Sequence, residues 1–195
     1  MAGAMTWLCA CADVVHTPDH VATIISREAA AKPSHLQNVA VVAIVDHFKL
    51  GTRPNDDALV ANGNYRMDSL MPAILRRFPA QLSRADVRAE AVPYAPGHAE
   101  ALSRAMTRCD YVIELAPHAV NQQKYVADPS LILNVRLLNH ALQPIWVARL
   151  ELRTDGLPDR GRGDIRQWSD AMADDLAALL MRQLADDGFV GRPRG

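Results

Sequence analysis

Three histidines, each closely following an apolar segment, are the residues of this chain best suited to chemistry. They are His47, His98 and His118, after residues 39–45, 87–94 and 111–116 respectively. Imidazole transfers protons near neutral pH and is a common ligand of zinc and iron. The carboxyl ends of parallel strands lie side by side in an open sheet, so the three side chains could converge in one crevice. They are therefore candidate ligand-binding residues.

Two carboxylates extend this candidate cluster, Asp46 beside His47 and Glu114 within the third apolar segment. Together the five would make a metal or acid/base site, which is the enzyme-like alternative for this chain. Polar residues also end strands simply because strands end at the surface. The spacing is not diagnostic, and the sequence has no G-x-S-x-G, P-loop, G-x-G-x-x-G or H-E-x-x-H motif. We therefore assign no catalytic residue, metal or cofactor, and interpret His35 and His140 as ordinary surface histidines.

Length and charge narrow the class of protein. The chain has 195 residues, of which 49% are hydrophobic, so it is long enough for one domain with its own core. Its 21 Lys and Arg balance 22 Asp and Glu, which gives a net charge of -1. The basic residues are dispersed in short groups. This balance argues against nucleic acid as a partner, because such binding depends on clustered positive charge.

The first twelve residues are apolar or small apart from Thr6, and the chain then turns polar at Asp13. A bilayer span needs ~20 apolar residues, so this stretch is too short to cross a membrane. It contains Leu8-Cys9-Ala10-Cys11, which resembles a bacterial lipobox and makes Cys11 the candidate for lipidation. The alternative interpretation is an ordinary cytoplasmic amino terminus. Cys109 ends an apolar helical stripe and is predicted to be a buried small hydrophobe.

The remaining elements are predicted from hydrophobic periodicity. Residues 39–45 are a continuous apolar run rich in β-branched side chains, typical of a central strand covered on both faces. Residues 13–37 are interpreted as a linker with a weakly helical part near 21–31, and residues 48–65 as a long connection. A helix should begin at Asp68 or Ser69 and be kinked or ended by Pro79.

Five further elements follow the second predicted strand at 87–94. A helix is expected over 97–109 and a third strand over 111–116. The segments 131–138 and 145–152 are separated by a short turn and should form an antiparallel hairpin. The last helix begins near Asp164 and ends at Gly188, with Phe189 folding back. Trp146 and Trp168 are expected to pack between the hairpin and this helix.

These elements predict an α/β fold, with a mixed sheet of three strand-helix elements, a β-hairpin and a C-terminal helix packed on it. Residues 38–190 would form one domain, after a possible signal segment at 1–12 and the linker at 13–37. Residues 191–195 would be a tail.

The order of these elements resembles the α/β domain of bacterial envelope proteins: the curli-secretion lipoprotein, the TolB amino-terminal domain and the lipoprotein activators of penicillin-binding proteins. The resemblance rests on residues 39–45, on 131–146 with Ile145-Trp146, and on 172–189 with its Leu-rich, Gly-Phe ending. It implies a non-enzymatic accessory or assembly domain, periplasmic and attached to the outer membrane by lipid alone. Its partners would be envelope proteins, including copies of itself. The cytoplasmic alternative keeps the fold and loses the anchor.

Overall fold

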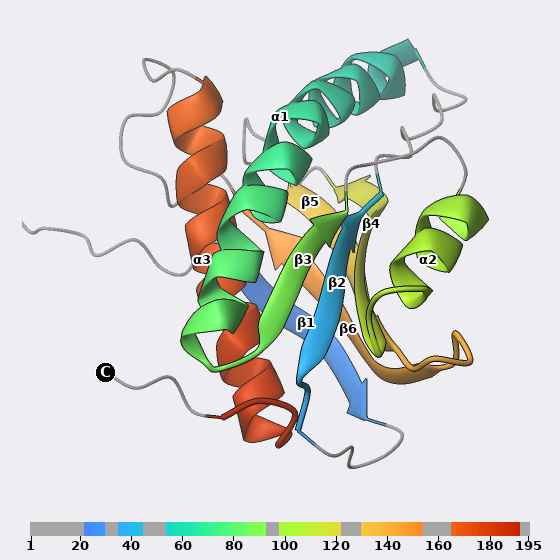
Figure 1. The fold of residues 1–195 in the computed structure, drawn as a ribbon. Coiled ribbons are helices and arrows are strands. Elements are labelled where there is room, and N and C mark those ends of the chain that lie inside the picture. Colours follow the sequence, from blue (N-terminus) through green and yellow to red (C-terminus); the bar gives the residue numbers. More distant parts are fainter. Residues whose placement is uncertain are drawn as a thin grey trace, which may run out of the picture.

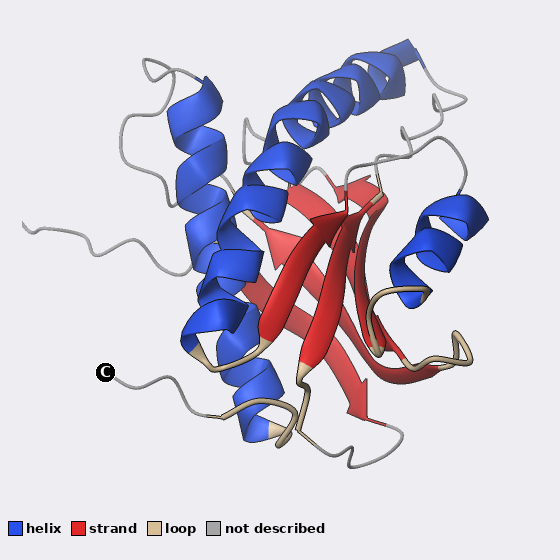
Figure 2. Cartoon of the chain, in the orientation of Figure 1, coloured by secondary structure: helices blue, strands red, loops and turns tan. Residues whose placement is uncertain are grey.

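The computed structural model describes residues 22–29, 35–44, 54–92, 98–121, 130–153 and 165–191, without the side chains at 54–66, 98–99, 101, 120–121 and 165–168. In these residues one six-stranded sheet is packed between helices (Figure 2). The predicted α/β fold with a mixed sheet and a C-terminal helix is therefore confirmed.

The sheet has the strand order β1-β6-β5-β4-β2-β3. Strands β2, β3 and β4 run parallel to one another, and β4, β5, β6 and β1 alternate in direction. The predicted hairpin is confirmed as β5 and β6. The strands are β1 (Ala22–Ala29), β2 (Asn38–Ala43), β3 (Arg88–Val92), β4 (Tyr111–Asn121), β5 (Ser130–Leu138) and β6 (Pro144–Leu152).

Strand β2 is buried on both faces, as its uninterrupted apolar sequence predicted. Val39, Val41 and Ala43 belong to the larger core, beneath α1 (Pro54–Arg84) and α3 (Ile165–Asp186). The alternate residues Ala40, Val42 and Ile44 belong to a smaller core beneath α2 (His98–Met106). Figure 1 shows α1 and α3 on one side of the sheet and α2 on the other. The period of two along a strand is what sends alternate side chains to these two cores.

Helix α1 corrects two expectations. It begins at Pro54, well before Asp68, so much of the predicted connection at 48–65 is helical. It also does not end at Pro79, which was one of the two outcomes we expected there, and continues to Arg84. Proline removes one backbone hydrogen bond. The fully buried Phe78 and Leu82 lie on either side of Pro79, and their burial offsets that loss.

Strand β1 is a further correction, because this segment was expected to be a weakly helical connector. It pairs antiparallel with β6 from Ala22 to Ala29. The backbone N–H of Ala22 also donates to Asp175 Oδ2 on α3 at 2.8 Å. A local sequence pattern does not show whether a distant strand is available for pairing. Here the pairing with β6 determines that the segment is a strand. The register shifts between Ile24 and Ser26, which leaves Ile25 in a bulge, 52% exposed.

The end of α3 confirms the sequence prediction. Gly188 has a φ of 81°, a left-handed conformation that favours glycine. The N–H of Phe189 donates to the carbonyl of Leu184 at 2.8 Å, and the Phe189 side chain folds back to full burial. The carbonyl of Phe189 accepts from the N–H of Leu36 at 2.9 Å, which ties the helix end to the segment before β2.

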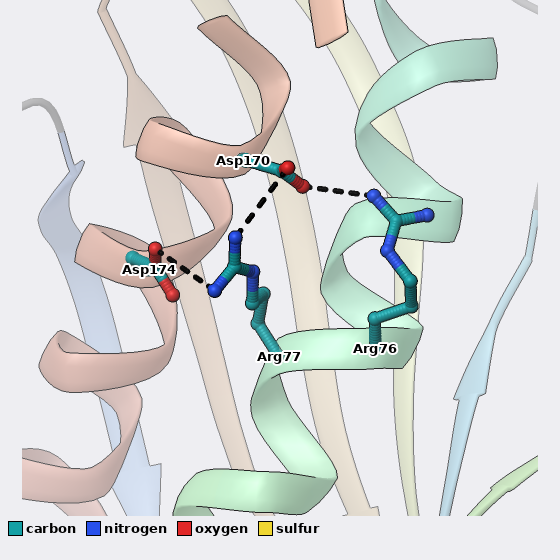
Figure 3. Close-up of polar contacts among 4 residues, drawn as sticks. All are labelled: Arg76, Arg77, Asp170 and Asp174. Carbon is teal, nitrogen blue, oxygen red and sulfur yellow. Dashed lines mark hydrogen bonds and ion pairs between the residues drawn. The ribbon is translucent and has the colours of Figure 1, made fainter. Parts of the chain in front are cut away.

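Ion pairs join the exposed sides of α1 and α3 (Figure 3). Arg76 Nη2 lies 2.8 Å from Asp170 Oδ1, and Arg77 Nη2 lies 3.4 Å from Asp170 Oδ2. Arg77 Nη1 also reaches Asp174 Oδ2 at 3.7 Å. The hydrogen bond from Arg76 is the main reason that the pKa of the Asp170 carboxyl is lowered from its ordinary value. From the sequence, arginines were interpreted as dispersed surface charges. In the structure Arg76 and Arg77 form ion pairs with the neighbouring helix.

Burial of β2 generates the first prediction. Val42→Asp should abolish cooperative folding, because Val42 is 0% exposed and an unpaired carboxylate cannot be solvated there. Ile25→Asp introduces the same charge at the exposed bulge of β1 and should leave folding intact. Circular dichroism with urea unfolding compares the two. A cooperative transition in Val42→Asp like that of the parent chain would contradict the burial of β2.

A second prediction concerns the pH dependence of the α1–α3 contact. Because the folded-state pKa of Asp170 is lowered, its stabilising contribution is present above the ordinary carboxyl pKa and is lost as the pH falls through the lowered value. Asp170→Asn should therefore lower the melting temperature at pH 7, and the difference from the parent should vanish in acid. Thermal unfolding across pH measures this. Asp174→Asn, which removes only the longer 3.7 Å contact, should have the smaller effect.

Candidate functional site

The strands that precede His47 and His98 and the strand that contains His118 are neighbours. Strand β2 lies between β3 and β4 and runs parallel to both, so their carboxyl ends meet at one edge of the sheet. Asp46 and His47 lie outside the described residues. His98 is the first residue of α2, and its side chain is likewise not described. Convergence of the three histidines therefore stays a prediction.

His118 is the candidate whose side chain can be placed. It lies in β4, where the pairing with β5 shifts register between Pro117 and Ala119, and it is exposed. The strand thus continues beyond residue 116, past the predicted end. A bulge of this kind turns a side chain away from the regular alternation of the strand.

Glu114 has a structural partner. It is 1% exposed and lies directly opposite Arg136 in the β4–β5 ladder. Arg136 Nε donates to Glu114 Oε1 at 2.8 Å, and Arg136 Nη2 donates to the same oxygen. A buried carboxylate needs such a charged partner, because burial alone strongly disfavours its ionised form. The carboxylate that we grouped with the histidines is therefore engaged in a cross-strand ion pair.

A groove of about 980 Å³ lies at the opposite edge of the sheet, at the amino ends of β2 and β4. Three segments that are distant in sequence form it: the residues before β2, the start of β4 and the turn of the β5–β6 hairpin. The histidines that the sequence left as unremarkable meet here. The lining residues are His35, Gln37, Asp110, Tyr111, Asn139, His140 and Ala141.

The hairpin turn beside this groove is held by Asn139. Its side-chain Oδ1 accepts hydrogen bonds from the N–H groups of Ala141 and Gln143, both at 3.0 Å. Its carbonyl accepts from the N–H of Leu142 at 2.8 Å. Asparagine side chains commonly stabilise turns in this way. The turn is therefore fixed by its own hydrogen bonds.

Cys109 has the predicted role. It is a buried free thiol in the smaller core, and burial is the main reason that its pKa is raised. A raised pKa keeps the thiol protonated, whereas nucleophilic catalysis needs the thiolate. Within the parts of the chain that the structure describes, no three His, Cys, Asp or Glu side chains gather as metal ligands. No helix in those same parts has the length and hydropathy to cross a bilayer.

Asp187 is a residue whose role sequence reasoning missed. It lies next to the carboxyl end of α3, where a negative charge is unfavourable for the helix dipole. Its Oδ2 accepts a hydrogen bond from Trp146 Nε1 at 2.7 Å and lies 3.4 Å from Arg27 Nε on β1. The predicted packing of Trp146 against the last helix is confirmed, and the carboxylate explains how the buried indole N–H is satisfied. The signal available in the sequence was Trp146 itself, since a buried indole needs an acceptor.

Comparisons with known proteins show similarity of fold. No family model and no curated protein matches the chain. A PelC dodecamer from Paraburkholderia phytofirmans is similar at 15% identity and a TM-score of 0.42, over 81% of this chain and 96% of that one. Protein XCC0632 from Xanthomonas campestris, described by the family model DUF330, is similar at 14% identity and a TM-score of 0.42, over 81% and 89%. Nothing about activity or partners follows at this level, and kinship with the TolB group stays a prediction.

The Trp146–Asp187 contact generates a third prediction. Asp187→Ala should lower the free energy of unfolding by about 1–3 kcal/mol, because it leaves the buried indole N–H without its acceptor. Asp186→Ala removes the exposed neighbouring carboxylate and should change that free energy by less than ~0.5 kcal/mol. Urea denaturation measures both variants. Equal effects at the two positions would show that the carboxylate of Asp187 does not stabilise Trp146.

Proposed function

We propose that this chain is a lipid-anchored accessory domain of the bacterial envelope that acts through contacts with other proteins, copies of itself included. The observation that carries the proposal is the pattern Leu8-Cys9-Ala10-Cys11 at the end of an apolar segment. In this interpretation Cys11 becomes the lipidated first residue, and residues 1–10 leave with the signal. The folded domain would then be periplasmic and attached to the outer membrane through its lipid.

Three carboxylates of the described residues have structural roles. Glu114, Asp170 and Asp187 each lie in a contact between two elements of the fold, on Arg136, Arg76 and Trp146 respectively. Side chains used in this way stabilise the domain. The surface, in contrast, carries exposed residues at the edge strand β1 and at the hairpin turn. A rigid core with varied surfaces is suited to binding other proteins.

Anchoring is tested by comparing two cysteine variants expressed from the natural locus. Cys11→Ala should release the protein from the membrane fraction, because the lipid would be its only anchor. Cys9→Ala is the matched control, two residues earlier, and should stay in the membrane fraction, since a small residue there fits the lipobox. Globomycin, which inhibits lipoprotein signal peptidase, should cause the unprocessed precursor of the parent to accumulate.

Two results would contradict the proposal. In the first, Cys11→Ala fractionates with the membrane as the parent does, or the parent stays in the cytosol. In the second, purified protein carries stoichiometric zinc or iron that the combined change of His47, His98 and His118 to Ala removes. That result would favour the metal-site alternative.

A further inference from the structure

Strand β1 contributes little to the core, although it belongs to the sheet. Ala22 is its one buried residue, Ile24 is partly buried against the larger core, and residues 25–29 are all exposed. The strand lies at the edge of the sheet and pairs with β6 alone (Figure 1). Elements that bury few apolar side chains open locally at a lower free energy than the core does. Detachment of β1 would therefore remove little apolar burial.

Polar contacts hold β1 against α3. The backbone N–H of Ala22 donates to Asp175 Oδ2 at 2.8 Å. Arg27 Nη1 donates to Gln183 Oε1, and Arg27 Nε lies 3.4 Å from Asp187 Oδ2. The three acceptors follow one another at helical spacing, so they lie on one face of α3. Water replaces polar contacts of this kind at a small net cost, whereas it cannot replace apolar burial.

The pairing of β1 with β6 is divided by the bulge at Ile25. Residues 22–24 pair on one side of the bulge and residues 26–29 on the other. The extra residue of a bulge is left unpaired and disrupts the ladder locally. Each half of the ladder is thus shorter than a typical strand, which has about 5–6 residues.

Strand β6 does not depend on β1 for its place in the sheet. It pairs with β5 from Pro144 to Leu152. Its inward side chains belong to the larger core, to which α1 and α3 also contribute; they are Trp146, Ala148, Leu150 and Leu152. The other five strands and the helices of the described residues therefore keep their main contacts when β1 leaves.

We propose that β1, residues 22–29, is a releasable strap. It detaches from β6 and α3 as a unit while the rest of the described domain stays folded. Because β1 follows Cys11 in the chain, its release lengthens the link between that residue and the domain. An extended chain rises by ~3.3 Å per residue, so the eight residues add up to about 26 Å of reach. The gain in reach rests on the proposed lipid anchor, whereas the detachment does not.

Hydrogen exchange followed by mass spectrometry tests the detachment on the full chain carrying Cys11→Ala. After correction for intrinsic rates, residues 22–29 should exchange at least about tenfold faster than residues 38–43. Low urea should hardly change the exchange of β1, because detachment exposes little surface, and should accelerate that of β2. If residues 22–29 exchange with the urea dependence of β2, they open only with the whole domain and the proposal is wrong.

Two single substitutions test the contacts with α3. Arg27→Ala removes both contacts of that side chain and should accelerate the exchange of residues 22–29 about tenfold, with residues 38–43 unchanged. Glu28→Ala is the matched control, because it removes the next charged side chain of the same exposed strand. It should change neither rate. Equal acceleration by the two substitutions would contradict the assignment of Arg27 as a tie between β1 and α3.

A double substitution tests whether the domain folds without the strap. Ile24→Asp with Arg27→Ala removes the partly buried isoleucine and the contacts of Arg27, and should leave β1 detached. The chain should still unfold in one cooperative urea transition and should keep residues 38–43 protected from exchange. Loss of that transition would show that β1 is an integral part of the fold, and the strap would be excluded.

The gain in reach is measured on lipidated protein in phospholipid vesicles. A fluorophore attached through Arg84→Cys, at the exposed end of α1, should transfer less energy to an acceptor in the bilayer when β1 carries the double substitution. Unchanged transfer would overturn the lengthening. Failure of Cys11→Ala to release the protein from the membrane fraction would refute the lipid anchor and leave the exchange results untouched, so the two proposals fail separately.

Discussion

Strand β2 has no exposed side, and this constraint shapes the rest of the domain. Residues 39–43 are fully buried, so both faces of the strand need an apolar cover. Helices α1 and α3 supply it on one face and α2 on the other (Figure 1). Parallel neighbours on both edges complete the backbone hydrogen bonds of the strand, which a buried strand cannot leave unpaired. The amino and carboxyl ends of β2 are then the places where loops and side chains reach the surface.

Polar contacts act at the boundaries between the packed layers. Arg76 and Arg77 join α1 to α3 on their exposed sides, and Asp187 joins the end of α3 to β6 and β1. Glu114 and Arg136 form the corresponding contact between β4 and β5. Apolar burial supplies the driving force for folding but is not directional, whereas these pairs have defined geometry. They fix how the elements align once the core has brought them together.

The candidate site illustrates how far spacing along the chain can lead. From the sequence we expected histidines near the ends of apolar runs to form a site. The strands that precede or contain these histidines are adjacent in the sheet. Yet Glu114 in the same region is held by Arg136, and the groove of the described residues lies at the other edge. His35 and His140 line it although they are far apart in sequence. Local pattern cannot show that two distant turns face one another, because that depends on the order of strands.

The sequence by itself determined the elements whose signals are local. The apolar sequence of β2, the short turn of the hairpin and the Gly188-Phe189 ending each set a conformation through nearby residues. Tertiary structure decided the rest. Residues 22–29 form a strand because they pair with β6. Helix α1 continues past Pro79 because the buried side chains of Phe78 and Leu82 lie on both sides of it. The groove arises only where three distant segments meet, and no local interaction encodes that meeting.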